Sequence, residues 1–191
     1  MTALLSSTYF GPVQWYQKLK RFDHVLIERC DSYVKQTYRN RCLIATTNGV
    51  QPLTVPVADG MHISDHGNWR HQHWNALVTA YSDSPFFEFY EDDIRPFFTE
   101  KWEFLYDFNE AIRQTMCALI DISPDVAYTT SYEAEAENDF RAAICPKHPA
   151  PDPDFQARPY YQVYAQKHGF IANLSVLDLL FNMGPESIFY L

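Results

Sequence analysis

Apolar residues at the start of the chain follow strand and helix periods in turn. Residues 4–7 and 24–28 are short apolar stretches that predict strands. Between them, residues 13–19 have the spacing of a short helix that begins beside Pro12, a residue favoured in the first helical turn. This order predicts a strand–helix unit at the N-terminus, followed by a second strand.

A β-hairpin is predicted over residues 41–57. Two apolar runs meet there at Asn48-Gly49, a dipeptide typical of tight hairpins because both of its residues tolerate a positive φ. Pro52 and Pro56 place the second strand of the hairpin at an edge or give it irregular ends, because proline cannot donate a backbone hydrogen bond.

From residue 69 onward the spacing of apolar residues is mostly helical. It predicts helices over residues 69–81, 86–94, 103–119 and 174–181. A short strand is predicted over residues 126–130, and the five prolines between Pro146 and Pro159 predict an extended connection on the surface.

Residues 160–166 alternate in a way that predicts one further strand. In that strand Gln162, Tyr164 and Gln166 share one face, which suits the wall of a polar pocket better than a core. With 191 residues and strands interspersed with helices, the chain is expected to be a single α/β domain spanning residues 1–191. Its expected architecture is a mixed sheet with the N-terminal strand–helix unit, the hairpin near 41–57 and helices packed on the sheet.

Charge and composition exclude several classes of function. The net charge of −9 argues against non-specific nucleic-acid binding, which needs many cations against phosphates. The sequence has neither a signal-peptide pattern nor an apolar run of membrane-spanning length, so we expect a cytoplasmic protein without membrane insertion. The four cysteines lack metal-binding spacing and are expected to be reduced, with no metal site. The sequence leaves the cofactor and the oligomeric state open.

The basic segment YVKQTYRNR, residues 33–41, is a candidate anion-binding site directly before an apolar strand. Lys35, Arg39 and Arg41 can hold a phosphate or carboxylate, Arg through its bidentate fork and Lys as a point charge. Asn40 can orient a ligand amide or carbonyl. Solvent-exposed surface residues are the alternative interpretation of the same pattern.

Two further polar positions are candidates because of their predicted elements. Gln14 follows the first strand, and ligands bind beyond the carboxyl ends of strands in open α/β sheets. His73 lies on the helix predicted over 69–81, where it can act as a general base; a structural histidine is the alternative. Its neighbour His71 lies two residues away and faces elsewhere on a helix, so the two histidines form a poor metal pair.

Four segments in this order resemble the WbqC-like protein family of bacteria, most closely its shorter, Bacteroides-type members. They are FGPVQWYQKLKRFDHVLIE, YVKQTYRNR followed by LTVPV, ISDHGNWRHQHW, and YAQKHGFIANLSVLDLLFNMG. The positions that match family motifs are Gln14, Lys35, Asn40, Arg41, Trp69, His73, Tyr164, Gln166, Asp178 and Asn182. Two departures are Tyr161-Gln162, where a His-Pro pair is expected, and the absence of a Gly-rich stretch between residues 129 and 159.

The resemblance implies a cytoplasmic enzyme of surface-polysaccharide (O-antigen-type) sugar biosynthesis or tailoring. The implied reaction is transfer of a small acyl or amino-acid group to an activated sugar, and the expected substrate is a nucleotide sugar. His73 and Lys35 are then the expected catalytic residues. The expected substrate-binding residues are Gln14, Arg39, Asn40, Arg41, Trp69, Tyr164 and Gln166.

Two alternatives stay open beside the enzyme. One is a non-catalytic ligand-binding or scaffold protein of the same pathway, and the other is a thiol enzyme that uses Cys30 or Cys42. The enzyme hypothesis requires distant segments to meet around one cavity. It also predicts that alanine at His73 or Arg41 abolishes turnover or binding while thermal stability stays nearly unchanged.

Overall fold

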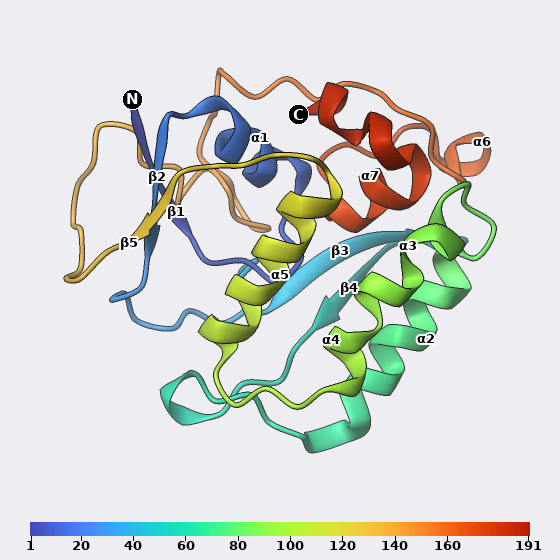
Figure 1. The fold of residues 1–191 in the computed structure, drawn as a ribbon, viewed down its shortest axis with the longest axis horizontal. Coiled ribbons are helices and arrows are strands. Elements are labelled where there is room, and N and C mark those ends of the chain that lie inside the picture. The colour runs from blue at the N-terminus through green and yellow to red at the C-terminus, as the bar shows by residue number, and fades with distance from the viewer.

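The strands divide into two sheets in the computed structural model, which describes residues 1–191. β1 (Thr2–Ser6), β2 (His24–Glu28) and β5 (Val126–Tyr128) form a parallel sheet in the order β1-β2-β5. β3 (Arg41–Thr46) and β4 (Gly49–Thr54) form a separate antiparallel hairpin (Figure 1). The predicted α/β class is confirmed, but the strands of both orientations do not share one mixed sheet.

The edge of β1 that faces away from β2 is occupied, so the hairpin cannot pair there. The Leu4 N–H donates to the carbonyl of Asn138 at 2.9 Å, and the Phe140 N–H donates to the carbonyl of Leu4 at 3.0 Å. A returning segment far along the chain therefore occupies the hydrogen-bonding edge that a further strand would need.

The hairpin forms where it was predicted, but its turn is displaced by one residue. Thr46 pairs with Gly49, so Thr47 and Asn48 form the two-residue loop. Gly49 opens β4 with a φ of 103°, whereas Asn48 is not among the residues with positive φ. The glycine supplies the unusual backbone conformation, and the asparagine does not.

Helices and short 3-10 turns make up the rest of the ordered structure. They are α1 (Val13–Arg21), α2 (Trp69–Tyr81), α3 (Phe87–Ile94), α4 (Pro96–Thr99), α5 (Leu105–Leu119), α6 (Ala165–His168), α7 (Val176–Met183), η1 (Asp59–Met61), η2 (His66–Asn68) and η3 (Gly184–Tyr190). The five predicted helices correspond to α1, α2, α3, α5 and α7, with ends that agree within about two residues, the ordinary uncertainty of helix boundaries. Figure 1 shows α2, α3 and α4 together beside the hairpin, with α5 in front of β3.

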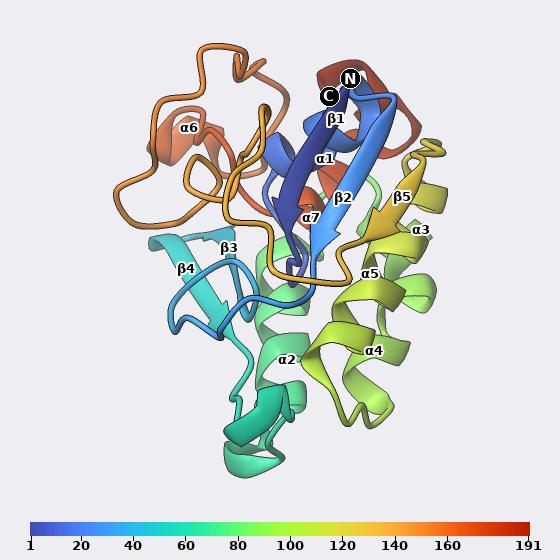
Figure 2. The ribbon, with the colours of Figure 1, turned by 90° about the vertical axis from the view of Figure 1, so that its left-hand side faces the viewer.

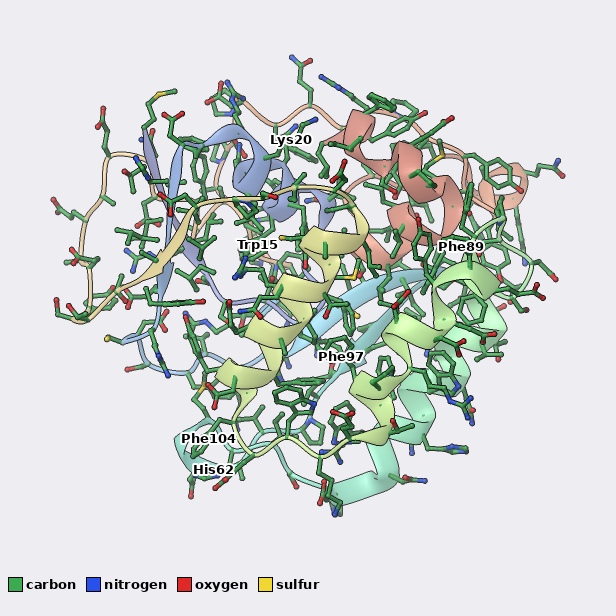
Figure 3. The ribbon with its side chains drawn as sticks, viewed as in Figure 1. Trp15, Lys20, His62, Phe89, Phe97 and Phe104 are labelled. Carbon is green, nitrogen blue, oxygen red and sulfur yellow. The ribbon has the colours of Figure 1, made fainter.

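One hydrophobic core of 40 buried residues joins both sheets to the helices. Aromatic rings dominate its centre: Phe10 lies 5.8 Å from Phe97 and 6.0 Å from Phe98 between ring centroids. Figure 3 shows Trp15 and Phe97 inside the surrounding ribbons, whereas Phe89 lies on the outer side of α3. None of the helices has both the length and the apolar character needed to cross a membrane.

Candidate functional site

A cavity of about 770 Å³ lies beyond the carboxyl ends of β1 and β2. Its walls come from residues 6–8 after β1, from residues 30–39 after β2, and from a distant segment, residues 132–145. Figure 2 shows the arrowheads of β1 and β2 pointing the same way, with the segments that follow β2 and β5 running past them. This edge is where open parallel sheets bind ligands, so the cavity is the leading candidate site.

The turn after β1 is shaped by Gly11. A side chain at this position would place its Cβ 2.4 Å from the hydroxyl oxygen of Thr8, so only glycine fits. The turn leads into α1, and the Trp15 indole N–H donates back to the Ser6 carbonyl at 2.9 Å. Trp15 therefore forms one apolar wall of the cavity and also fixes the end of β1.

A buried carboxylate, Glu28, holds two walls of the cavity together. It accepts the Thr129 hydroxyl and the Cys30 N–H at 2.7 Å, the Glu133 N–H at 3.0 Å, and the Arg141 guanidinium at 3.3 Å. Burial alone would raise the pKa of Glu28, but these hydrogen bonds and the Arg141 charge together keep it below its ordinary value. The ionised carboxylate thereby fastens the 129–141 segment to the end of β2.

Each of two cavity walls carries an arginine paired with a carboxylate. Arg39 forms an ion pair with Asp31 and donates to the Ser32 carbonyl at 2.8 Å. Arg141 lies 2.6 Å from Asp139, and both residues line the cavity. A ligand that carries both a positive and a negative group can therefore find a partner for each, whereas a simple anion must compete with carboxylates already in place.

One predicted substrate-binding residue lines this cavity, and the predicted catalytic residue Lys35 lies on a segment that borders it. Arg39 lines it directly and is largely buried. Lys35 is exposed on the segment between Val34 and Thr37, and these two neighbours line the cavity. The basic segment before β3 is thus only partly assembled into the site.

Gln14 lies in a buried polar network on the neighbouring face of α1. Its amide N–H donates to Asp152 at 2.8 Å, its side-chain carbonyl accepts from Asn173 at 2.9 Å, and Asp152 lies 2.7 Å from the Lys18 ammonium. These contacts connect α1 to the proline-rich segment and to the start of α7. Gln14 does not line the cavity.

Asn40 and Arg41 hold the strands of the hairpin together. The Asn40 side-chain amide donates to the Val55 carbonyl at 2.9 Å, and the Arg41 Nε–H donates to the Thr54 hydroxyl at 3.0 Å. Neither residue lines the cavity, and Asn40 is buried. Both side chains bond to the end of β4 and so stabilise the hairpin, a structural role that the sequence pattern did not indicate.

His73 lies in the core, together with Trp69. The His73 Nδ1 is 2.8 Å from the Tyr9 hydroxyl, and the imidazole packs 5.1 Å from the Trp69 ring. Burial lowers the pKa of His73 to about 4, while a hydrogen bond with the backbone of Thr54 acts in the opposite direction. Alanine here would leave the buried Tyr9 hydroxyl without a partner, so from the structure we expect this substitution to lower stability.

The buried imidazole makes stability depend on pH. The unfolded side chain takes up a proton near pH 6.5 and the folded one near pH 4, so acidification between these values favours the unfolded chain. We expect wild-type protein to lose about 3 kcal/mol more than His73→Asn on going from about pH 7.5 to about pH 4. Urea unfolding at both pH values measures the difference, and equal losses in the two proteins contradict it.

The strand predicted over residues 160–166 is wrong. The Gln162 side chain bonds to both the N–H and the carbonyl of Ile171 at 2.9 Å, closing a loop that contains α6. Tyr164 donates to the Ala80 carbonyl at 2.8 Å, and Gln166 is exposed on α6. No strand runs beside this segment to pair with it, so the three polar side chains do not share a wall.

Several residues that define the cavity were not singled out in the sequence. Glu28 ends an apolar strand, and Arg141 and Asp139 lie in an acidic loop, so no local pattern distinguishes them. Cys30 and Cys145 both line the cavity, but no histidine is among its 18 lining residues. Cys42 is buried, and burial raises the pKa of its thiol, which makes it a poor nucleophile.

One family model and one curated relative match this chain. The model of the WbqC-like protein family matches residues 7–152. Uncharacterised protein Rv1507c of Mycobacterium tuberculosis is 28% identical over an alignment 222 positions long, which covers 99% of this chain and 96% of that protein. No solved structure matches the chain significantly.

Proposed function

This chain belongs to the WbqC-like protein family, and from that membership we propose that it is a cytoplasmic enzyme of surface-polysaccharide sugar biosynthesis or tailoring. The proposed reaction transfers a small acyl or amino-acid group to an activated sugar such as a nucleotide sugar. The family model ends at residue 152, but α7 packs in the same core, so we assign residues 1–191 to one WbqC-like domain.

The observation that carries the proposal is the pair of arginine–carboxylate contacts in one cavity. An amino-acid group has a carboxylate and an ammonium, and Arg39 with Asp31 and Arg141 with Asp139 offer both signs of charge. Holding two reactants together in the correct orientation accounts for much of the rate of a group-transfer reaction.

The cavity changes which groups are assigned to catalysis. Asp31 and Asp139 line it and can accept a proton from a bound nucleophile, whereas His73 lies in the core. Lys35, exposed on the segment that borders the cavity, stays the proposed partner for the anionic part of the activated sugar.

The same cavity gives a reason to keep the ligand-binding alternative. No histidine lines it, and both of its arginines already have carboxylate partners. A protein that only binds a pathway intermediate, or brings it to another enzyme, needs complementary charges but no acid–base group.

We expect a ligand of this cavity to raise the melting temperature, and Ala142→Trp to abolish the rise. Ala142 is an exposed lining residue, so a large side chain fills the cavity without entering the core. A ligand at a hundredfold excess over its Kd stabilises the native state by about 2.7 kcal/mol. Amino acids, acyl carriers and nucleotide sugars, alone and in pairs, form the screen.

Ala136→Trp is the matched control, because Ala136 is exposed on the same loop but does not line the cavity. Product formation, detected by mass spectrometry, separates an enzyme from a binding protein. A ligand-induced shift that persists in Ala142→Trp would place the binding site elsewhere and refute the proposal.

A further inference from the structure

A second cavity of about 440 Å³ lies at the start of α2, beside α4. It contains part of the DHGNWRHQHW segment, which the first cavity does not use. We propose that this second cavity binds a nucleoside phosphate, through an aromatic floor and a cluster of cations.

The charge of this cavity is opposite to that of the whole chain. Three cations, Arg70, Arg95 and Lys101, line it together with a single carboxylate, Asp65, in a protein of net charge −9. Asp65 lies 2.8 Å from Lys101 and 2.5 Å from Arg70, and hydrogen bonds from these two cations lower its pKa. One carboxylate cannot neutralise three cations, so the lining keeps a net positive charge that attracts an anionic ligand.

Two of the three cations have hydrogen-bonding capacity left. Arg95 is exposed and makes no ion pair. The Nε–H of Arg70 is buried and has no acceptor. Phosphate suits a guanidinium well, because two parallel N–H groups can donate to two of its oxygens.

The backbone at the start of α2 adds to the positive potential. Gly67 and Asn68 have φ values of 78° and 49°, and no side chain caps the first turn of this 13-residue helix. The first N–H groups of an uncapped helix have no partner within it and favour a nearby anion.

Trp74 and Phe98 form the aromatic part of the cavity. Their ring centroids are 5.8 Å apart, and the Arg95 guanidinium lies 5.9 Å from the centre of the Trp74 ring. Phe98 is buried behind Trp74, so the half-buried Trp74 ring is the surface on which a nucleobase can stack while its phosphates reach the cations. Stacking of one base on an aromatic side chain contributes about 1 to 3 kcal/mol.

Binding of a nucleoside phosphate at the second cavity does not depend on the proposed enzymatic function. The two cavities share no lining residue. The first lies at the ends of β1 and β2 and the second at the beginning of α2, at the lower end of the molecule in Figure 1.

Isothermal titration of the full chain with uridine 5′-diphosphate tests the inference. We expect Arg95→Gln and Lys101→Gln each to weaken binding about tenfold, the effect of losing one charged hydrogen bond. Both residues are exposed, so the variants should fold, and circular dichroism checks that they do. Lys167→Gln removes the same charge from α6, outside the cavity, and should bind as the wild type does.

Uridine and pyrophosphate, titrated separately, should each bind more weakly than the diphosphate. Absence of diphosphate binding, or unchanged affinity in both Arg95→Gln and Lys101→Gln, overturns the inference. Loss of binding in Ala142→Trp assigns the nucleotide to the first cavity and likewise overturns it. Pyrophosphate that binds as tightly as the nucleotide removes the role of the aromatic floor and contradicts the proposal as stated.

Discussion

Replacing Asp178 by alanine is expected to lower the free energy of unfolding by at least about 3 kcal/mol, because three buried donors lose their acceptor together. The Asp178 carboxylate accepts hydrogen bonds from the hydroxyls of Tyr81 and Tyr160 at 2.8 and 2.7 Å, and from the Gln162 amide at 2.8 Å. Its exposed fraction is 1%, so water cannot replace the lost partner.

These contacts make Asp178 the junction of three parts of the chain. Tyr81 ends α2, Tyr160 and Gln162 belong to the segment before α6, and Asp178 lies in the first turn of α7. Burial raises the pKa of Asp178, and the hydrogen bonds from the tyrosines and the glutamine partly oppose that rise. The carboxylate has no cation among its partners, so these donors alone compensate for its burial.

Urea unfolding at neutral pH measures the effect, with Asp92→Ala as the control. Asp92 is an exposed aspartate on α3 and should change the free energy of unfolding by no more than about 0.5 kcal/mol. Asp178→Asn should fall between the two, because an amide keeps the shape and one acceptor oxygen. A loss below about 1 kcal/mol in Asp178→Ala would show that the tyrosines find other partners.

The helices and the hairpin could be predicted because their signals are local. The helical spacing of Phe108, Ile112 and Met116 on α5 lies within one short window, and all three are buried. The hairpin needs only two neighbouring apolar runs and a turn between them. Such patterns are complete within about 15 residues and do not depend on distant parts of the chain.

The cavity could not be predicted in the same way. Glu28 and Arg141, which hold its walls together, are 113 positions apart, and each looks ordinary among its neighbours. The burial of His73 depends on Tyr9, 64 positions away, so its helical position was foreseen but its environment was not. Whether a polar residue belongs to a site depends on the residues with which it forms hydrogen bonds and ion pairs. These partners can be distant in the sequence, and the periodicity of apolar residues does not reveal them.

The wrong prediction of a strand over residues 160–166 has a related cause. Alternation over seven residues is satisfied equally well by an irregular segment whose polar side chains bond to other parts of the chain. Gln162 bonds to Ile171 and Asp178, and Tyr164 bonds to the carbonyl of Ala80. A strand also needs an adjacent edge, and the edges of both sheets lie elsewhere.

Removing one partner of the Lys18–Asp152 ion pair is expected to destabilise the fold by about 3 to 5 kcal/mol. The Lys18 ammonium is fully buried, lies 2.7 Å from Asp152 and sits 4.4 Å above the centre of the Phe140 ring. Lys18→Met keeps the length of the side chain but leaves the Asp152 carboxylate with only the Gln14 amide as a side-chain donor. That carboxylate joins the proline-rich segment to α1. An unpaired charge on it should therefore weaken the contact between this segment and α1 before the rest of the fold is affected.

The double variant Lys18→Met/Asp152→Leu separates the ion pair from the packing. Replacing a whole buried pair by apolar side chains is often neutral, so the double variant should recover most of the stability that Lys18→Met loses. Burial acts to raise the pKa of Asp152. The hydrogen bonds from Lys18 and Gln14, together with the charge of Lys18, outweigh burial and keep this pKa below its ordinary value. The wild type should therefore lose stability as the pH falls through the lowered pKa, and the double variant should not show this loss. A double variant as unstable as Lys18→Met would mean that the charged pair itself, rather than the volume of its side chains, holds the proline-rich segment in place.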